Sequence, residues 1–376
     1  MKNILIIRNI LDCYLQRSQQ KFAPMIDPVT HIITKDYNAI KLTTYGSKVK
    51  LPKNNFLDTM FKALALIEKA LRKLIRLNRD TTFIECLYWN MLFKIRTPYK
   101  IFCIEPTQSM LKVCNLKKIK VCEVQHGVIG THIVKENKYF ADNFLTWDRR
   151  SSENILIKTQ KKVDPITSVN MLYYQHLLDK KYKGSNKIQI SDKKNILISL
   201  QWGLVSTHKY DAIKLEKSFL PLSFINFCKK NMKNYNFIFK LHPMSIKKRE
   251  AEVIFEDLKR HNLVNNFDDF LLSANQSVYE ALNLADIHVT LYSSIVIEAS
   301  NLNIPSIILD PHCNKGGPRE NYFKKEVEEG IAIVSNDDDI ESHVLTLLSK
   351  KYDNYKDFEV IESILEQSIY KFLDLH

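Results

Sequence analysis

Apolar and polar residues alternate in short blocks along this chain, and each block is typical of one strand or one helix. Runs rich in β-branched and aromatic residues predict buried strands. In chain order, strands are expected at residues 4–7, 31–34, 39–44, 101–104, 119–125, 144–146, 195–200, 237–242, 287–290, 304–309 and 331–334. Most of these runs are separated by segments with helical periodicity. This order predicts an α/β fold built on parallel sheets.

The clearest helix is expected at 56–79, where apolar residues recur at a spacing of three or four. The rest of its surface is mostly basic, with six lysines and arginines against Asp58 and Glu68 within the helix. Such a helix either packs on the core with a solvated basic face or lies on anionic lipid. Other helices are expected at 82–93, 108–114, 169–178, 212–231, 247–261, 277–284, 295–300 and 355–375.

A polar segment at 179–194 separates the two halves of the pattern, and we interpret it as a domain boundary. We expect an N-terminal domain at 1–185, a second domain at 190–345 and a helical tail at 346–376. Each domain carries at least one strand–helix–strand unit. The chain length of 376 residues suits two ordinary domains.

Polar residues follow the predicted strand at 287–290, and they form the first candidate site. Ser293 and Ser294 open a short helix there, and Glu298 stands one turn later. Hydroxyls and free N–H groups at a helix start bind phosphate, and a carboxylate can accept a hydrogen bond from a ribose hydroxyl. The ordinary alternative is a serine that caps a core helix.

Other predicted strands also end in polar turns. Lys240 and His242 close one strand, and Gln201 follows another. In the first half, Glu105 and His126 end adjacent strands. Ligands of open α/β sheets bind at the carboxyl ends of the strands. We therefore expect ligand-binding turns in both halves.

These turns resemble those of a known family group. KLHP at 240–243, followed by LYSSIVIEA at 291–299, is similar to the donor half of bacterial GT-B glycosyltransferases. The resemblance is greatest to enzymes of capsule and lipopolysaccharide synthesis that use CMP-linked donors, the sialyl- and Kdo-transferase-like enzymes. CDP-glycerol polyol-phosphate transferases have similar turns. QHGVIGTH at 125–132 looks like a turn of capsule and O-antigen transferases. The resemblance implies two Rossmann-like domains facing each other across a cleft, with 1–185 on the acceptor side and 190–345 binding the nucleotide donor.

The resemblance implies transfer from a nucleotide sugar to a growing polysaccharide or a lipid-linked acceptor. A nucleotide then leaves as an anion, which Lys240, His242 and the Ser293–Ser294 turn could stabilise without a metal. The acceptor hydroxyl needs a base. We assign that role to His126, with Glu105 or Glu123 as an orienting group or as the base itself.

Composition narrows these hypotheses. The net charge of +13 suits an anionic substrate or membrane surface, although lysine is abundant throughout. No nucleic-acid motif is recognisable. The seven cysteines are scattered without a CxxC pair, and the Asp337–Asp339 triplet is typical of a helix start. We therefore expect no metal and no cofactor. With no apolar run long enough for a bilayer, we expect a cytoplasmic protein, peripheral on the inner face of the membrane if 56–79 binds lipid.

Three alternatives to a glycosyltransferase remain open at this point. The chain could transfer a polyol phosphate from a CDP-linked donor through the same turns. It could be a sugar-nucleotide epimerase of GT-B type, which needs no acceptor. It could also be a non-catalytic protein that binds a polyanion. Donor turnover with and without an acceptor separates these functions.

Overall fold

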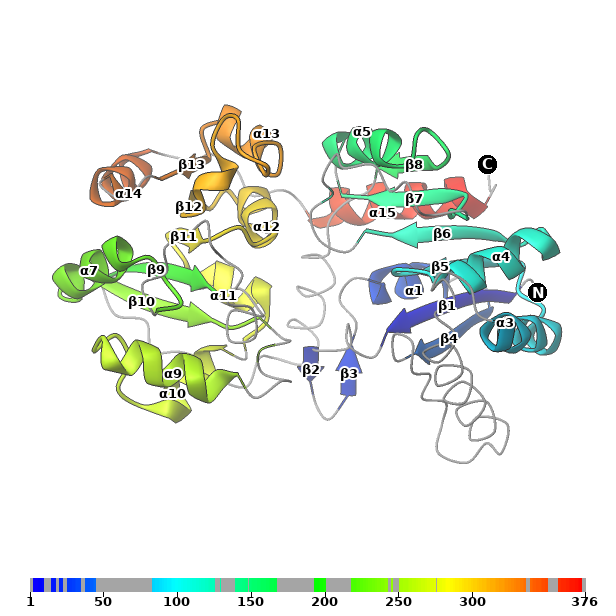
Figure 1. The fold of residues 1–376 in the computed structure, drawn as a ribbon, viewed down its shortest axis with the longest axis horizontal. Coiled ribbons are helices and arrows are strands. Elements are labelled where there is room, and N and C mark those ends of the chain that lie inside the picture. The colour runs from blue at the N-terminus through cyan, green and yellow to red at the C-terminus, as the bar shows by residue number, and fades with distance from the viewer. Residues whose placement is uncertain are drawn as a thin grey trace, which may run out of the picture. The chain divides into compact units, whose positions relative to one another are not determined.

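The computed structural model describes residues 3–9, 15–17, 20–22, 26–34, 38–44, 83–125, 129, 139–147, 149–167, 193–200, 218–242, 245, 250–274, 276–335, 339–350 and 358–373. The chain divides into two compact units. Unit 1 comprises Met1–Tyr174 and Phe358–His376, and unit 2 comprises Gln175–Asp357. Each unit has one parallel sheet with helices packed on it (Figure 1). This confirms the predicted α/β class with two Rossmann-like domains.

The sheet of unit 1 has the strand order β4-β1-β5-β6-β7-β8, with every neighbouring pair parallel. Its strands are β1 (Asn3–Asn9), β4 (Asn38–Thr44), β5 (Lys100–Cys103), β6 (Lys120–Val124), β7 (Asn143–Thr146) and β8 (Asp164–Thr167). Its described helices are α1 (Asp27–Ile33), α3 (Phe83–Arg96), α4 (Gln108–Lys117), α5 (Arg149–Lys158) and α15 (Phe358–Leu373). A separate antiparallel pair joins β2 (Leu15–Arg17) and β3 (Gln20–Phe22).

Unit 2 has the strand order β10-β9-β11-β12-β13, again all parallel. The strands are β9 (Lys194–Ser199), β10 (Tyr235–Lys240), β11 (Ile287–Thr290), β12 (Ser306–Ile308) and β13 (Ala332–Val334). The described helices are α7 (Leu222–Asn231), α9 (Ala251–Arg260), α10 (Phe267–Ala274), α11 (Val278–Leu284), α12 (Ile295–Asn301), α13 (Lys324–Glu328) and α14 (Ile340–Ser349).

The central strands are buried on both faces, as parallel strands covered by helices must be. Every residue of β11 is buried, and so is every residue of β9 after Lys194. Continuous apolar runs in the sequence therefore predicted these strands well. Helix starts are also specified locally. Ser277 and Glu280 form a reciprocal capping box at the start of α11.

The predicted strand at 31–34 is wrong, because these residues end helix α1 and its C-cap. A proline stands in the first turn of α1, where its missing N–H breaks no helical hydrogen bond. Val29, Ile32 and Ile33 are buried, which is the spacing of a helical face. The helices predicted at 56–79 and 169–178 lie outside the described residues. None of the described helices is both long enough and apolar enough to cross a membrane.

Both sheets share one topological feature that locates their functional edges. The first strand of each sheet lies between the second and the third in chain order, β1 between β4 and β5, and β9 between β10 and β11. The chain connections around the first strand of each sheet thus run in opposite directions. In such sheets, ligands bind in a crevice at the carboxyl ends of the strands where the direction changes. The topology places the two candidate crevices at the ends of β1 and β5, and of β9 and β11.

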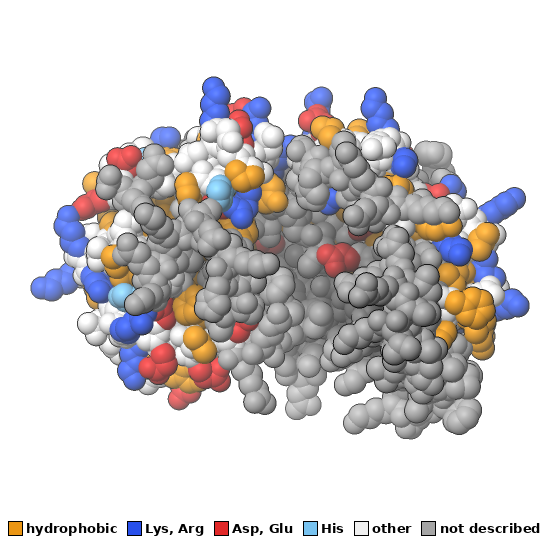
Figure 2. Space-filling view, viewed as in Figure 1, with side chains coloured by type: hydrophobic (Ala, Val, Ile, Leu, Met, Phe, Trp, Pro, Cys, Tyr) orange, Lys and Arg blue, Asp and Glu red, His pale blue; other side chains and the backbone are white. Residues whose placement is uncertain are grey.

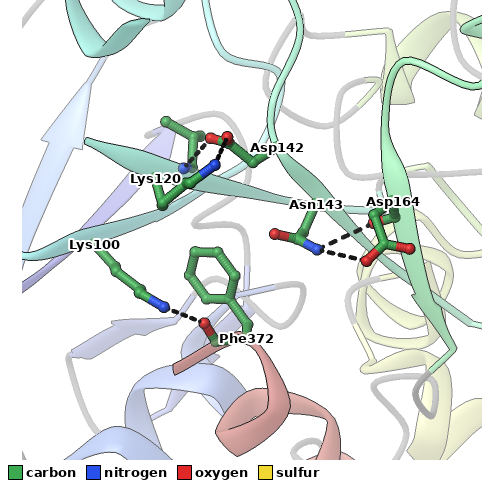
Figure 3. Close-up of polar contacts among 7 residues, drawn as sticks. Lys100, Lys120, Asp142, Asn143, Asp164 and Phe372 are labelled. Atoms are coloured by element: carbon green, nitrogen blue, oxygen red, sulfur yellow. Dashed lines mark hydrogen bonds and ion pairs between the residues drawn. The ribbon is translucent and has the colours of Figure 1, made fainter. Parts of the chain in front are cut away.

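The opposite, amino-terminal edges are closed by structural polar contacts. In unit 1, Asp142 accepts from Lys120 Nζ at 2.7 Å and from the backbone N–H of Val121 at 2.9 Å (Figure 3). In unit 2, Asp286 accepts from Lys194 Nζ at 2.7 Å and from the Asn195 N–H at 2.8 Å. In both units, an aspartate thus accepts hydrogen bonds from a lysine side chain and a backbone N–H at the start of a neighbouring strand. It leaves the carboxyl edges as the candidates for function.

Helix α15 lies in the segment predicted as a helical tail at 346–376, and it packs on unit 1 (Figure 1). The ring of Phe372 packs edge-on against Phe102 of β5, with centroids 4.8 Å apart. The buried Lys100 donates from Nζ to the carbonyl of Phe372, near the C-terminus of the helix (Figure 3). A cation there balances the negative end of the helix dipole.

Candidate functional site

The carboxyl edge of unit 2 brings together most of the residues predicted to bind a donor. Lys240 ends β10 and His242 follows it, while Ser293 and Ser294 follow β11. Strand β9 lies between them and pairs with both. Gln201, also predicted here, lies outside the described residues. The predicted residues thus gather at the edge that the topology marks as a ligand crevice.

The two serines differ in how the turn uses them. The Ser293 N–H donates to Thr290 Oγ1 at 3.2 Å, and Ser293 Oγ accepts from the Ile295 N–H at 3.3 Å. Ser294 is the N-cap residue of α12, but its side chain makes no capping hydrogen bond. Both residues are partly exposed. The expected ordinary role, a capping hydroxyl, therefore describes Ser293 better than Ser294.

A buried charged cluster lies beneath this edge. Lys240 and Glu298 are both buried, and Glu280 of α11 lies near enough to act on Lys240. Burial lowers the pKa of Lys240 to about 8, and Glu280 and Glu298 oppose that shift. Burial also raises the pKa of Glu298 to about 8, and the lysine limits that rise. Both groups therefore change charge easily near neutral pH when an ionic ligand arrives.

His242 lies one residue beyond the end of this buried region and is partly exposed. Its carbonyl accepts from the Ser245 N–H at 2.9 Å, which closes a tight turn after β10. The imidazole is thereby carried on a backbone that continues directly from the end of β10. This arrangement suits a residue that contacts a phosphate.

The loop after β12 contributes a cation that the sequence did not single out. Arg319 forms an ion pair with the buried Asp310, and its guanidinium lies 4.3 Å from the centroid of Tyr292. Gly317 is required in this loop, because a Cβ there would lie 2.2 Å from the carbonyl oxygen of His312. The Gly316–Gly317 pair was the only signal in the sequence that this loop makes a close approach.

His288 is a structural residue of β11. It is fully buried in β11, and its two ring nitrogens lie 2.6 Å from Ser199 Oγ and 3.0 Å from Ser306 Oγ. Burial lowers the pKa of His288 to about 3, so the ring is neutral. It joins β9, β11 and β12 through side-chain hydrogen bonds.

In unit 1, two carboxylates occupy the corresponding edge. Glu105 lies two residues beyond the end of β5 and is exposed, with a backbone φ of 47°. Glu123 lies on the adjacent strand β6, and its side chain is partly buried. Burial raises the pKa of Glu123 to about 8, the charge of Glu105 adds to the rise, and Lys158 opposes it. A non-glycine residue at positive φ is strained, and such strain is common at functional sites.

His126, the predicted base, lies outside the described residues, but the residue before it is firmly held. Gln125 is fully buried. Its Oε1 accepts from the Trp147 N–H at 2.8 Å, and its Nε2 donates to Ser151 Oγ at 3.2 Å. These bonds tie the end of β6 to β7 and α5. The loop that carries His126 therefore starts from a fixed point.

No group of three or more potential metal ligands occurs among the residues that the structure describes. Two of the three residues of the Asp337–Asp339 triplet are outside them, so its role stays a prediction. Independence from metal is likewise a prediction for experiment.

Part of the chain matches a known protein family by sequence. Residues 191–363 match the model of a family described as CDP-Glycerol:Poly(glycerophosphate) glycerophosphotransferase. This segment is almost all of unit 2 and includes every predicted donor residue. Curated proteins give no match to the chain by sequence.

Solved structures decide the architecture. UDP-GlcNAc 2-epimerase from Methanocaldococcus jannaschii has a TM-score of 0.55 and 14% identity, covering 98% of this chain and 99% of its own. The chain has the GT-B fold. The same enzyme from Neisseria meningitidis, bound to UDP-GlcNAc, gives 0.54 and 12%, covering 99% and 98%. MnaA from S. aureus with UDP gives 0.53 and 12%, covering 100% and 98%. At these identities the likeness concerns the fold alone.

Proposed function

We propose that this GT-B protein is a transferase that moves a polyol phosphate, of the glycerophosphate type, from a CDP-linked donor to a surface polymer. The observation that carries the proposal is the family match over 191–363. That segment contains Lys240, His242, Ser293, Ser294 and Glu298 at one sheet edge. Glycosyl transfer from a CMP-linked sugar is our second candidate, because the GT-B fold and the KLHP and LYSSIVIEA turns suit it equally.

Both reactions release the same leaving group. In the first, an acceptor hydroxyl oxygen bonds to the β-phosphorus of the donor, the bond to the bridging oxygen breaks, and CMP leaves. In the second, the hydroxyl oxygen bonds to the anomeric carbon and CMP leaves again. Each therefore needs positive charge and donors near the departing phosphate. His242 and the Ser293–Ser294 turn supply donors in unit 2, and the buried Lys240 supplies positive charge from beneath them. Contact of the buried Glu298 with the ribose stays a prediction.

The acceptor must lose its proton as it attacks, and unit 1 supplies the candidate bases. His126 follows the anchored Gln125, and Glu105 stands at the crevice marked by β1 and β5. Glu123 lies beside Glu105, and its raised pKa suits a group that exchanges a proton near neutral pH. We propose that one of these three takes the proton and that no metal ion is needed.

The proposed partners follow from the reaction. They are a nucleotide-linked donor and an oligosaccharide or lipid-linked acceptor, with no nucleic acid. A lipid-linked acceptor places the enzyme at the inner face of the cytoplasmic membrane, in the cytoplasm. The basic segment 56–79 is a candidate membrane contact.

The decisive experiment measures release of the nucleotide from CDP-glycerol, CMP-sialic acid, CMP-Kdo and UDP-GlcNAc, each with and without a polyol-phosphate acceptor. We expect acceptor-dependent release of CMP from CDP-glycerol. His242→Ala and Ser294→Ala should weaken nucleotide binding by about 1.5–3 kcal/mol each. Ser300→Ala, at the other end of α12, is the matched control.

Three outcomes would contradict the proposal. Acceptor-dependent turnover of a CMP-sugar alone would select glycosyl transfer. Conversion of UDP-GlcNAc without any acceptor would select the epimerase alternative. Full nucleotide affinity in both His242→Ala and Ser294→Ala would remove the donor assignment itself.

A further inference from the structure

The amino-terminal edge of the unit 1 sheet, opposite its candidate crevice, collects the C-termini of four helices. In a parallel sheet each helix returns toward the starting edge of the strands. Accordingly α3 ends before β5, α4 before β6 and α5 before β8, while α15 ends beside Lys100 (Figure 1). The surface residues of this edge are therefore set by the last turns of these helices and the loops after them.

The edge is strongly basic. Its lysines and arginines among the described residues of α3, α4, α5 and the turns after them are Lys94, Arg96, Lys117, Lys118, Lys120, Lys158, Lys161 and Lys162. The carboxylates described at the starts of the strands here are Asp142 and Asp164. Asp142 is paired with Lys120, and Asp164 accepts from Asn143 at 3.3 Å (Figure 3). A large excess of positive charge remains.

Large aliphatic side chains are exposed among these cations. Leu116 is 75% exposed, Ile95 64% and Ile157 51%. Each stands beside a lysine or arginine in the sequence and in the last turns of a different helix. Figure 2 shows hydrophobic and basic side chains side by side over the α3 and α4 region at the right of the view. The three residues thus combine exposed apolar side chains with neighbouring cations at one edge of the sheet.

Two of the lysines occupy backbone positions that usually go to glycine. Lys118 is the left-handed C-cap of α4 with φ of 56°, and Lys161 has φ of 59° after α5. A side chain in that conformation costs about 1–2 kcal/mol relative to glycine. Balance of the helix dipoles accounts for one cation in each last turn. It accounts neither for lysine at these caps nor for the exposed aliphatic residues.

We propose that this edge, defined by Ile95, Leu116, Ile157 and the surrounding lysines and arginines, docks on the surface of an anionic lipid bilayer. The cations complement the charge of the headgroups, and the aliphatic side chains insert among them. Nucleic acid is a poorer fit, because its bases stack on aromatic rings, whereas the exposed large side chains here are aliphatic. The proposed surface uses none of the residues 56–79 and none of the candidate catalytic or donor-binding residues, so the inference does not depend on the proposed function.

Vesicle sedimentation of the full chain tests the docking. With vesicles of equal parts phosphatidylglycerol and phosphatidylcholine, the wild type should bind in a salt-sensitive manner, and with phosphatidylcholine alone it should not. The charge variant Lys117→Glu, Lys118→Glu, Lys161→Glu should lower partitioning about 100-fold or more. The apolar variant Ile95→Ser, Leu116→Ser, Ile157→Ser should also lose binding. Lys233→Glu, Lys315→Glu, Lys350→Glu in unit 2 makes the same charge change and should bind like the wild type.

A second readout keeps the test valid if a triple variant is unstable. Leu116→Cys labelled with an environment-sensitive dye should shift to the blue with anionic vesicles, while a label at Leu345→Cys, an exposed site of unit 2, should not. The wild type, treated with the same dye in parallel, controls for labelling of the native cysteines. The proposal is overturned if the dye at Leu116→Cys shows no blue shift with anionic vesicles. It is also overturned if the charge and apolar variants bind vesicles fully while Lys69→Glu, Lys73→Glu, Arg76→Glu releases the protein. Binding to an oligonucleotide but not to vesicles would overturn it as well.

Discussion

Burial lowers the pKa of two basic side chains of unit 2, His288 and Lys240, but the two residues have different chemical roles. His288 is neutral and hydrogen-bonded on both ring nitrogens, so it serves the sheet. Lys240 is buried beside two glutamates, and its charge is balanced within its own cluster. Only Lys240 can respond to an anionic ligand, because its pKa of about 8 lies within reach of the working pH.

Lys240 therefore predicts a proton linkage. A phosphate bound near the ammonium favours its charged form and raises the lowered pKa. Above about pH 8 the free protein has lost this proton and the complex regains it, so CMP binding takes up a proton and weakens as pH rises. Calorimetry of CMP binding in buffers of different ionisation enthalpy measures the uptake. Lys240→Met should abolish it and weaken binding by about 1–3 kcal/mol.

Lys194→Met is the control for this measurement. Lys194 starts β9, the strand beside β10, but pairs with Asp286 at the amino-terminal edge. Its loss should leave both the proton uptake and the affinity unchanged. Equal proton uptake by the wild type and Lys240→Met would show that the lysine does not sense the nucleotide.

At this scale the sequence located residues that follow strands but not residues joined across loops. Lys240, Ser293 and Ser294 were found because apolar runs mark where each strand ends. The ion pair of Asp310 with Arg319 was missed, because it depends on the path of the loop after β12. The positive φ of Glu105 leaves no trace in composition, since glutamate rarely adopts it.

Among the elements, continuous apolar runs predicted the central strands, while exposed or short elements escaped. Strand β8 contains Asp164 and Pro165 and lies at the sheet edge, where proline is tolerated and the apolar signal is weak. Helix α1 was mistaken for a strand because its apolar residues are few and closely spaced. The return of α15 to unit 1 depends on tertiary contacts such as that of Phe372 with Phe102, which no local pattern specifies.

The docking of α15 rests partly on one buried cation. Lys100 Nζ donates to the Phe372 carbonyl and lies 4.9 Å from the Phe372 ring centroid and 5.3 Å from that of Tyr99. Lys100→Met keeps the aliphatic volume but removes the charge, so the helix end loses its donor. We expect the free energy of unfolding to fall by about 1–3 kcal/mol, measured by urea denaturation. Hydrogen exchange within 358–373 should accelerate more than in β5.

Lys120→Met supplies the comparison. Lys120 starts the next strand and pairs with Asp142, but its side chain is 62% exposed. Exposed ion pairs contribute about 1 kcal/mol or less. If both variants have the same stability as the wild type, the contact of Lys100 with α15 does not hold the helix on unit 1.

Across the whole molecule, two sheets of related topology carry different chemistry at corresponding edges. Our candidate donor residues, with cationic and hydroxyl side chains, lie at the carboxyl ends of β10 and β11 in unit 2. The corresponding edge of unit 1 carries Glu105 and Glu123, two of our candidate bases. Because both sheets place the first strand between the second and third, the same topological rule marks both candidate edges. The division of roles between the two units came from the family resemblance, and it stays a prediction.

This division predicts that binding and turnover respond to different units. Glu105→Gln or His126→Ala, whichever removes the base, should lower kcat by about 10²–10⁴-fold and leave the Kd for CMP unchanged. His242→Ala should raise that Kd. Rapid-quench turnover and calorimetry on the same preparations measure both quantities. A loss of CMP affinity in His126→Ala would show that the histidine contacts the donor and that the proposed division is wrong.

The pH dependence of kcat then identifies the base. If Glu123 is the base, activity in the wild type rises as pH increases through about 8, because that carboxyl must lose its proton. Glu105→Gln removes the nearby negative charge that helps to raise this pKa, so the rise should move to lower pH while turnover persists. If His126 is the base, the rise should lie near 6.5. In that case Glu105→Gln and Glu123→Gln should still show the rise of kcat with pH near 6.5. His126→Ala should keep only a residual activity, without this rise. If Glu105→Gln abolishes turnover and His126→Ala barely changes it, the exposed carboxylate is itself the base and the histidine only shapes the turn.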